Sequence, residues 1–386
     1  MLTLLLIVIY ITFISLGLPD SLFGSAWSTI RMDFGIGLSM ASPITMTISF
    51  CTVISSLSYD FLVKKFKTQY ITTVSVLFTA LALFGFSLVG HYAFFIVLAI
   101  PLGLGAGAVD TGLNNYVAVH FKPHHMGWLH GFWGLGALLG PMLMSIFLGN
   151  DGGWRTGYKL IGIIQFTLVA VLIISLPLWK HAKPNSAYVA KEEPTFKGPV
   201  IRTPGLIFAM LIFLFYCGVE QSFGVWAASY FTEVRGLSAS VAARWSSFYF
   251  IGLTIGRFAT GFLTFKFTNI KLIRFGVISM LTGALLFIIP GPNILSLLGL
   301  IVTGVGSAPI FPSMIHETPA RFGVAMSQKI MGIQMASSYV GVVLIPPIVG
   351  AVADLTIGIV VLPIFIMIFS ILLFICNQAL NSVKAS

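Results

Sequence analysis

The chain has 386 residues, of which 57% are hydrophobic and only 8% are charged. An ordinary soluble domain carries about 25% charged residues, so this composition excludes a soluble globular protein. It also excludes disordered and disulfide-rich chains, and the net charge of +10 reflects basic turns between apolar runs rather than a surface for nucleic acid.

Twelve apolar runs follow one another along the chain, and a membrane-spanning helix needs about 20 such residues. Six are centred near residues 14, 49, 79, 105, 138 and 168, and six near 216, 252, 280, 304, 339 and 367. The sustained polar stretch 180–203 separates the two groups. We therefore expect an all-α membrane protein of twelve transmembrane helices. Its parts are a six-helix N-terminal half (1–179), a cytoplasmic linker (180–203) and a six-helix C-terminal half (204–386).

Positive charge is distributed unevenly between the loops. If the N-terminus lies inside, 15 Lys and Arg residues fall in cytoplasmic segments, 5 fall in external loops, and Arg257 lies within a helix. Cytoplasmic loops of membrane proteins carry the excess of basic residues, so we expect both termini to be cytoplasmic. The short loops favour the plasma (inner) membrane of a bacterium, and we expect a monomer.

The two halves repeat one another in sequence at an almost constant offset of 200 or 201 residues. The matched pairs include Gly103-x-Gly105 with Gly304-x-Gly306, Gly140 with Gly341, and Asp20 with Glu220. Such internal repeats are typical of secondary transporters, whose substrate site lies near the midplane between the repeats. The repeat therefore predicts alternating access around a site between the halves.

Four charged side chains fall inside predicted spans, namely Asp20, Asp110, Glu220 and Arg257. An ionised group at the bilayer centre costs about 2.5 to 3.5 kcal/mol, so such residues are functional candidates. The first of them, Asp20, follows Pro19 and matches Glu220 in the repeat. We expect Asp20 to take part in proton coupling; the alternative is a helix merely kinked by the proline.

Asp110 and Asn114 lie four residues apart in a glycine-rich run and so share one helix face. Removal of water favours the protonated form of a carboxylate, which suits Asp110 to load and release a proton. Asn114 beside it is a candidate substrate ligand. The alternative is a structural hydrogen bond to a neighbouring helix.

Two further pairs offer groups that bind sugars. An indole face can stack on a sugar ring and an imidazole can bind its hydroxyls, so His130 and Trp133 are candidate substrate ligands, with anchoring at the membrane surface as the alternative. Glu220 and Gln221 form a candidate hydroxyl-binding pair, or else a contact between helices.

Two charged residues are placed to act in gating. Asp60, followed by Lys64 and Lys65 in the turn after the second helix, is suited to a cytoplasmic lock. Arg257 lies towards the cytoplasmic end of its helix, where we expect its side chain to extend to the surface and join the gate.

Four short motifs carry a resemblance to a known family. They are Pro19-Asp20, Gly105-Ala106-Gly107-Ala108-Val109-Asp110-Thr111, Tyr216-Cys217-Gly218-Val219-Glu220 and Ile255-Gly256-Arg257-Phe258. With them the chain resembles the major facilitator superfamily and, within it, the fucose permease and related monosaccharide proton symporters. The resemblance implies roles in proton coupling and substrate binding for Asp20 and Asp110. It also places His130 where the permease has an amide, and Glu220 where the permease has a glutamine.

A second signature supports a different direction of transport. Gly127-x8-Gly136-x3-Gly140-Pro141 resembles the helix 5 signature of drug-proton antiporters, with Met144-Ser145 where a Gly-Gly pair would complete it. Proton-coupled efflux of a small amphipathic compound therefore stays open as the alternative function.

The sequence predicts a secondary active transporter that carries a glucose-, mannose-, galactose- or fucose-like monosaccharide with a proton. An enzyme is not expected, because no His-Glu-x-x-His, Gly-x-Ser-x-Gly or phosphate-loop motif occurs in the sequence. The expected partners are the sugar, the proton and the lipid bilayer, without nucleic acid, cofactor or metal. A receptor built like a transporter is a further alternative.

Overall fold

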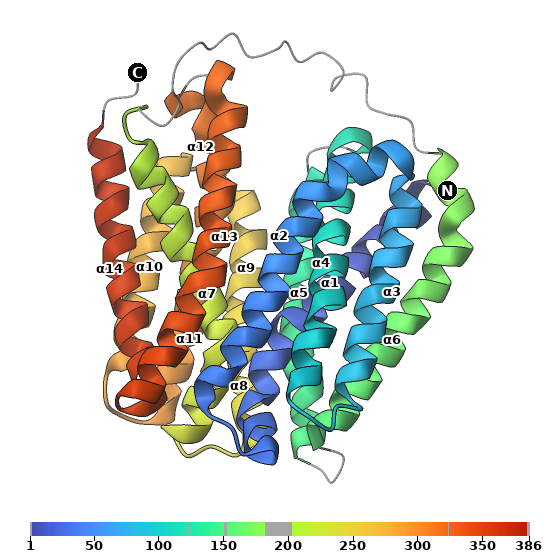
Figure 1. The fold of residues 1–386 in the computed structure, drawn as a ribbon. Helices are drawn as coiled ribbons and strands as arrows, with labels where there is room; N and C mark the ends of the chain where they lie inside the picture. The colour runs from blue at the N-terminus through green and yellow to red at the C-terminus, as the bar shows by residue number, and fades with distance from the viewer. Residues whose placement is uncertain (1, 122–123, 150–152, 182–202, 323, 384–386) are drawn as a thin grey trace. The chain divides into compact units, whose positions relative to one another are not determined.

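The computed structural model describes residues 2–121, 124–149, 153–181, 203–322 and 324–383. All regular elements in these ranges are helices (Figure 1). Those of the first half are α1 (Leu2–Phe34), α2 (Ala41–Lys65), α3 (Thr68–Phe86), α4 (Ala93–His120), α5 (His124–Leu148) and α6 (Gly153–Ser175). Those of the second half are α7 (Leu206–Glu233), α8 (Ala239–Ser246), α9 (Phe248–Leu263), α10 (Asn269–Ile288), α11 (Asn293–Ser307), α12 (Ile310–Phe322), α13 (Val324–Leu355) and α14 (Val361–Ser382).

These helices make up twelve successive segments in the described part of the chain. α8 and α9 adjoin at Ser247, and α11 and α12 are separated only by Ala308 and Pro309, so each pair forms one broken segment. Eleven helical stretches of the described residues are long and apolar enough to cross a membrane. α9, with 16 residues, is too short to be one of them. The expected all-α transmembrane fold class is confirmed.

Large apolar side chains are exposed along many of these helices. Phe50, Leu57 and Ile174 are 62%, 79% and 78% exposed, and Phe262 is 74% exposed. Exposure of so much apolar surface to water is unfavourable in free energy, whereas lipid chains solvate such a surface. The exposed faces therefore identify the helix surfaces that meet the bilayer.

The chain divides by its internal contacts into two compact units. The first unit holds residues 1–190 and 227–247, and the second holds 191–226 and 248–386. The units differ from the expected halves at 227–247, because α8 packs against α5. Most of the expected linker, 180–203, lies outside the described residues.

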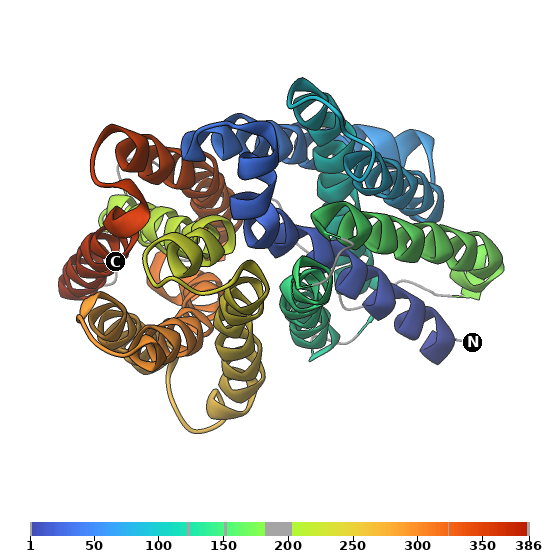
Figure 2. The ribbon, with the colours of Figure 1, turned by 90° about the horizontal axis from the view of Figure 1, so that it is seen from below.

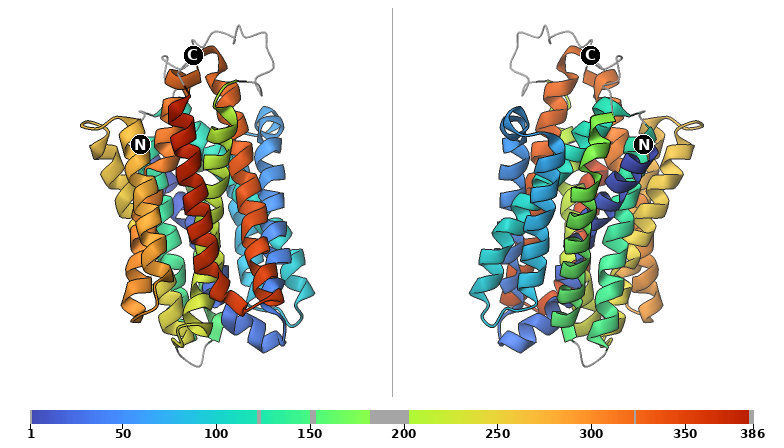
Figure 3. Two further views of the ribbon diagram at one scale, coloured as in Figure 1. Left: turned by 90° about the vertical axis from the view of Figure 1, so that its left-hand side faces the viewer. Right: turned by 90° about the vertical axis from the view of Figure 1, so that its right-hand side faces the viewer.

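Within each unit the helices pack side by side along most of their length. Figure 2 looks along the helices, and Figure 3 shows α3 beside α6 in the first unit and α10 beside α14 in the second. The buried core of the first unit includes Leu5 and Val8 of α1, Val109 of α4, Leu129 of α5 and Leu168 of α6. This core fixes the relative positions of the helices that carry the candidate acids of that unit.

Contacts between helices repeat at the same offset as the sequence. Gly103 of α4 lies against the carbonyl oxygen of Ile48 on α2 in the first unit. In the second unit, Gly304 of α11 lies against the carbonyl oxygen of Tyr249 on α9, which is 201 residues later at both positions. A Cβ atom at either glycine would collide with that oxygen. The glycines of the repeat are therefore explained by close helix packing.

The repeat changes register in α13. Gly136 of α5 lies against the carbonyl oxygen of Ile14, and Gly341 of α13 lies against that of Leu214, 200 residues further on. The structural counterpart of Gly341 is thus Gly136, and the expected pairing of Gly341 with Gly140 is wrong. α13 has 17 residues before its contact glycine and α5 has 12, so more than one extra turn precedes this contact.

Candidate functional site

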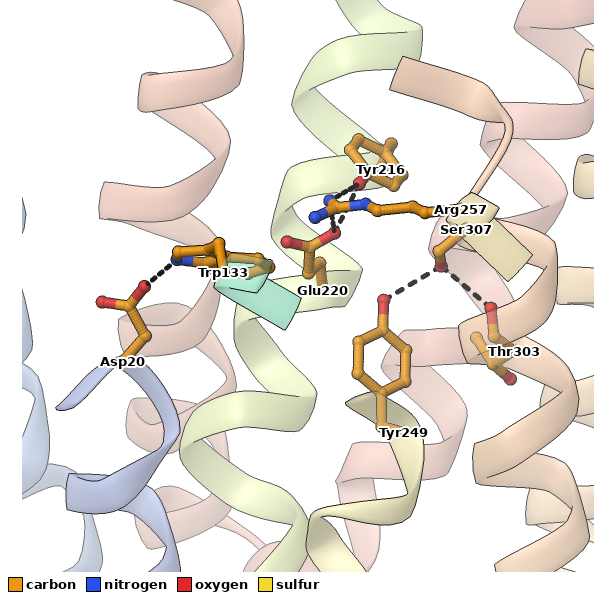
Figure 4. Close-up of polar contacts among 8 residues, drawn as sticks. All are labelled: Asp20, Trp133, Tyr216, Glu220, Tyr249, Arg257, Thr303 and Ser307. Atoms are coloured by element: carbon orange, nitrogen blue, oxygen red, sulfur yellow. Dashed lines mark hydrogen bonds and ion pairs between the residues drawn. The ribbon is translucent and has the colours of Figure 1, made fainter. Parts of the chain in front are cut away.

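The first polar cluster joins α1 to α5 in the first unit. The indole Nε1 of Trp133 donates a hydrogen bond to Oδ2 of Asp20 over 2.7 Å (Figure 4). The two helices can approach here because Gly17, one turn before Asp20, lies against the backbone of Trp133. Asp20 is exposed and Trp133 is half-buried. The structure thus brings an expected proton-coupling acid into contact with an expected substrate ligand.

The second cluster lies within α4. The side-chain amide of Asn114 donates to Oδ1 of Asp110 over 2.8 Å and to the Asp110 carbonyl oxygen over 3.0 Å. Asp110 and Asn114 therefore share one helix face, as expected, and their side chains bond each other directly. The Oδ1 atom of Asn114 is buried and has no hydrogen-bond partner among the described residues. An unsatisfied buried acceptor costs about 1–3 kcal/mol, so this oxygen is suited to accept from a ligand hydroxyl.

The remaining predicted site residues on α5, α7 and α2 are His130, Gln221 and Asp60. His130 on α5 is half-buried and meets the edge of the Phe13 ring, with the ring centres 6.1 Å apart. Gln221 is half-buried beside Glu220 on α7. Asp60 lies in α2, and its side chain lies outside the described part of the chain. The predicted roles of these residues stay predictions.

The third cluster lies in the second unit and joins α7 to α9 (Figure 4). The Tyr216 hydroxyl donates a short hydrogen bond to Oε2 of Glu220, one turn further along α7. The Nη2 atom of Arg257 on α9 lies 3.8 Å from the same carboxylate oxygen and donates to the Tyr216 hydroxyl over 3.4 Å. The Arg257 and Glu220 side chains are 15% and 18% exposed. One phenol, one carboxylate and one guanidinium group therefore form a mostly buried network.

The position of Arg257 corrects the expectation that its side chain extends to the surface. Its guanidinium group instead turns to Glu220 inside the second unit. A buried charge is costly unless it is paired and hydrogen-bonded, and the carboxylate and the Tyr216 hydroxyl supply both kinds of partner. The expected gating role of Arg257 stays a prediction.

A chain of hydroxyl groups lies next to this network in the second unit. The Tyr249 hydroxyl donates to Oγ of Ser307 over 3.0 Å, and Ser307 donates to the Thr303 carbonyl oxygen over 2.9 Å. Neither Tyr216 nor Tyr249 was assigned a role in the site from the sequence, although Tyr216 stands in one of the four family motifs. Tyr216 could have been found, because a residue four positions before Glu220 shares its helix face. Tyr249 gave no comparable signal.

Ion pairs at one end of the first unit were also missed. Arg31 of α1 lies 2.8 Å from Glu233 at the end of α7, and Arg155 of α6 lies 3.1 Å from Asp33. The Trp154 indole also donates to Asp33 over 2.6 Å. The Arg31–Glu233 pair joins residues from the two halves of the sequence, although both belong to the first compact unit.

Comparison with known proteins identifies the family. The family model of the Major Facilitator Superfamily matches residues 9–346. The Glucose/mannose transporter GlcP of Bacillus subtilis (strain 168) is 26% identical over 262 residues, which cover 65% of this chain and 64% of that protein. The human Sodium-dependent glucose transporter 1 is 24% identical over 343 residues, which cover 78% of this chain and 65% of that protein. The chain thus matches less than two thirds of the length of either relative.

Solved structures share the fold. The D-xylose-proton symporter has a TM-score of 0.76 at 13% identity, covering 99% of this chain and 98% of that chain. The E. coli fucose:proton symporter FucP has a TM-score of 0.64 at 16% identity, covering 98% of this chain and 99% of that chain. At these identities the likeness shows the fold alone.

Proposed function

We propose that this chain, which belongs to the Major Facilitator Superfamily, transports a monosaccharide together with a proton. The superfamily consists of membrane transporters and not of enzymes. Two proteins that resemble this chain are named as a glucose/mannose transporter and a sodium-dependent glucose transporter. The observation that carries the proposal is the hydrogen bond between Trp133 and Asp20, because it links an aromatic ring suited to a sugar with an acid suited to a proton.

The sugar is bound through its hydroxyl groups and one face of its ring. Asn114 offers a buried carbonyl oxygen without a partner, and Glu220 offers a carboxylate fixed on α7. Trp133 supplies a ring face, and His130 and Gln221 supply further hydrogen-bonding groups. Amide, carboxylate and imidazole groups all bind hydroxyls, so this set suits a small polyhydroxylated substrate.

The proton is carried by Asp20 and Asp110. Each accepts a hydrogen bond from a neutral N–H group, the Trp133 indole and the Asn114 amide respectively. Protonation weakens such a bond, because charge-assisted hydrogen bonds are about twice as strong as neutral ones. Loss of the charge therefore alters Trp133 and Asn114, which are the groups assigned to the sugar, and this links the two ligands.

Transport follows from alternating access of the site to the two sides of the membrane. Proton and sugar together favour the change of conformation, because a ligand shifts an equilibrium by its differential affinity for the two states. We assign the Arg31–Glu233 ion pair, which joins α1 to the end of α7, to a gate on one side of the membrane. We place both termini in the cytoplasm and the protein in the plasma membrane as a monomer. Asp60 belongs to the opposite gate.

Flux in proteoliposomes tests this proposal. Purified protein is reconstituted, a proton gradient is imposed, and uptake of labelled glucose, mannose, galactose and fucose is followed, with a sodium gradient in a parallel arm. We expect one sugar to accumulate under the proton gradient and Asp110→Asn to abolish this accumulation. Asp354→Asn, which changes an exposed acid at the end of α13, is the matched control. Accumulation driven by sodium alone would overturn the proton assignment.

Efflux by proton antiport gains no support from the glycine signature in α5. Gly136 and Gly140 lie against the carbonyl oxygens of Ile14 and Leu18, so close packing on α1 accounts for both glycines. If none of the four sugars moves through correctly folded protein, export of an amphipathic compound becomes the function to test.

A further inference from the structure

The network in the second unit converges on a single carboxylate oxygen. The Tyr216 hydroxyl and the Arg257 guanidinium group both meet Oε2 of Glu220. Arg257 also donates to the Tyr216 oxygen, so each of the three groups interacts with the other two. The other carboxylate oxygen, Oε1, has no hydrogen-bond or ion-pair partner among the described residues. One side of the carboxylate is therefore anchored and the other is available.

We propose that Tyr216 and Arg257 are positioning residues that hold Glu220 as a fixed, charged acceptor for a substrate hydroxyl, so that Glu220 takes no part in proton coupling. This inference rests on the proposed sugar transport and assigns the substrate and the proton to different acids. Glu220 binds the sugar through Oε1 in every protonation state of the carrier. The coupling protons are then confined to Asp20 and Asp110.

The charges around Glu220 support this division. The titratable side chains that interact with it are Tyr216 and Cys217 on its own helix and Tyr249 and Arg257 on α9. α11 contributes the hydroxyl of Ser307 to the same cluster and α13 that of Ser338, and neither titrates. Arg257 alone in this set is charged at neutral pH. Its guanidinium group, 3.8 Å from Oε2, is therefore the countercharge of the Glu220 carboxylate.

The repeat shows that this anchoring is particular to the second unit. The counterpart of Glu220 is Asp20, but the positions that correspond to Tyr216 and Arg257 are Leu16 and Ser56. Ser56 donates to the Gly107 carbonyl oxygen over 3.3 Å. The first unit thus repeats the acid without the phenol and the guanidinium group. An acid paired with a cation is suited to binding a substrate hydroxyl, whereas an acid with neutral donors is suited to gaining and losing a proton.

The test measures sugar affinity against pH in purified protein. The probe is whichever of glucose, mannose, galactose and fucose the wild type accumulates. In Arg257→Gln, Glu220 loses its countercharge, so we expect the ratio of variant to wild-type Kd to rise at least tenfold from about pH 8 to about pH 5. Arg257→Lys restores the charge and should keep this ratio within about threefold. A purely structural defect would weaken binding by the same factor at every pH.

Two further variants keep the test informative if Arg257→Gln folds poorly. The double variant Arg257→Gln/Glu220→Gln leaves no uncompensated charge, and its affinity ratio should not change with pH. Tyr216→Phe removes a donor to Glu220 and should weaken sugar binding. Tyr249→Phe, whose hydroxyl bonds Ser307 instead, is the matched control. Equal losses in Tyr216→Phe and Tyr249→Phe would contradict the assignment of Tyr216.

Flux through Glu220→Gln decides whether Glu220 carries a proton. We expect affinity to fall about tenfold, because a hydrogen bond to a charged group is about twice as strong as one to a neutral group, while accumulation at saturating sugar under a proton gradient persists. If the wild type accumulates sugar and Glu220→Gln only equilibrates it, Glu220 is a coupling acid and this inference alone fails. If the wild type transports none of the four sugars, the proposed function fails as well.

Discussion

The acids of the two units occupy related positions in the repeat but have different surroundings. In the first unit, Asp20 accepts from the neutral indole of Trp133. In the second unit, Glu220 accepts from Tyr216 and lies 3.8 Å from the guanidinium group of Arg257. The helix scaffold is repeated while the partner of the acid is not. Substitutions at the partners, as well as at the acids, therefore test whether the two halves differ in function.

The same contrast extends to the second acid of the first unit. Asp110 is hydrogen-bonded by the neutral amide of Asn114, and the residue 201 positions later is Phe311. Among the three acids that the sequence places inside spans, the two of the first unit are thus bonded to neutral donors, and the one of the second unit lies beside an arginine. We therefore expect Asp20 and Asp110 of the first unit to bind and release protons, and Glu220 of the second unit to present a fixed charge to the substrate.

The largest effect is expected for neutralisation of Asp110. Asp110→Asn removes the group that gains and loses the proton while keeping its size and its place beside Asn114. We expect accumulation under a proton gradient to vanish and exchange of internal for external sugar to persist, because exchange needs no net proton movement. Flux in proteoliposomes measures both. Persistent accumulation in the variant would remove Asp110 from the coupling mechanism.

A smaller effect is expected when the indole N–H of Trp133 is removed. Trp133→Phe keeps an aromatic face for the sugar but loses the bond to Asp20. Hydrogen bonds to charged groups contribute about 1.5–3 kcal/mol, so we expect proton-driven accumulation to fall about tenfold while sugar exchange is retained.

The control for Trp133 has the same chemistry elsewhere in the unit. Trp154→Phe also removes an indole donor from a carboxylate, that of Asp33 at the end of the bundle. We expect it to leave the ratio of driven accumulation to exchange unchanged. Similar losses of coupling in both variants would show that the Trp133–Asp20 bond has no special role.

Much of the fold could be predicted because it depends on local composition. Apolar runs of bilayer length located the spans, and the matched glycines Gly103 and Gly304 make matching helix contacts. The shift in α13 was missed because Gly140 and Gly341 also match at the offset of 201 residues that fits the other helices. Gly341 therefore matched Gly140 in sequence while it packs like Gly136.

The candidate site could be predicted only where partners share a helix. Asp110 and Asn114 are four residues apart, and the structure places them in direct contact. The contact between Asp20 and Trp133 depends on how α1 and α5 pack, which their separate sequences do not specify. The partner of Arg257 was missed for the same reason, because its direction depends on the face that α9 turns to α7.

Substitutions at the repeated glycine contacts test whether the stability of the two units depends equally on close helix packing. Gly103→Ala and Gly304→Ala each force a Cβ atom against a backbone carbonyl oxygen. Overpacking costs about 1–3 kcal/mol, and we expect similar losses of thermal stability in detergent for the two variants. Gly261→Ala in α9 meets nothing within 4 Å and should be neutral or stabilising. A loss confined to one unit would show that only one scaffold depends on close helix packing.

The smallest effect on stability is expected for the Arg31–Glu233 ion pair. Its side chains are 21% and 22% exposed, against 45% and 42% for Arg155 and Asp33. Both pairs still reach solvent, and ion pairs in contact with solvent contribute about 0.2–1 kcal/mol in double-mutant cycles, so Arg31→Gln should change thermal stability only slightly. If the pair holds one side of the carrier closed, however, Arg31→Gln should change the rate of sugar exchange, and Arg155→Gln should not. Equal exchange rates in the two variants would reduce Arg31–Glu233 to an ordinary surface pair and leave alternating access without this gate.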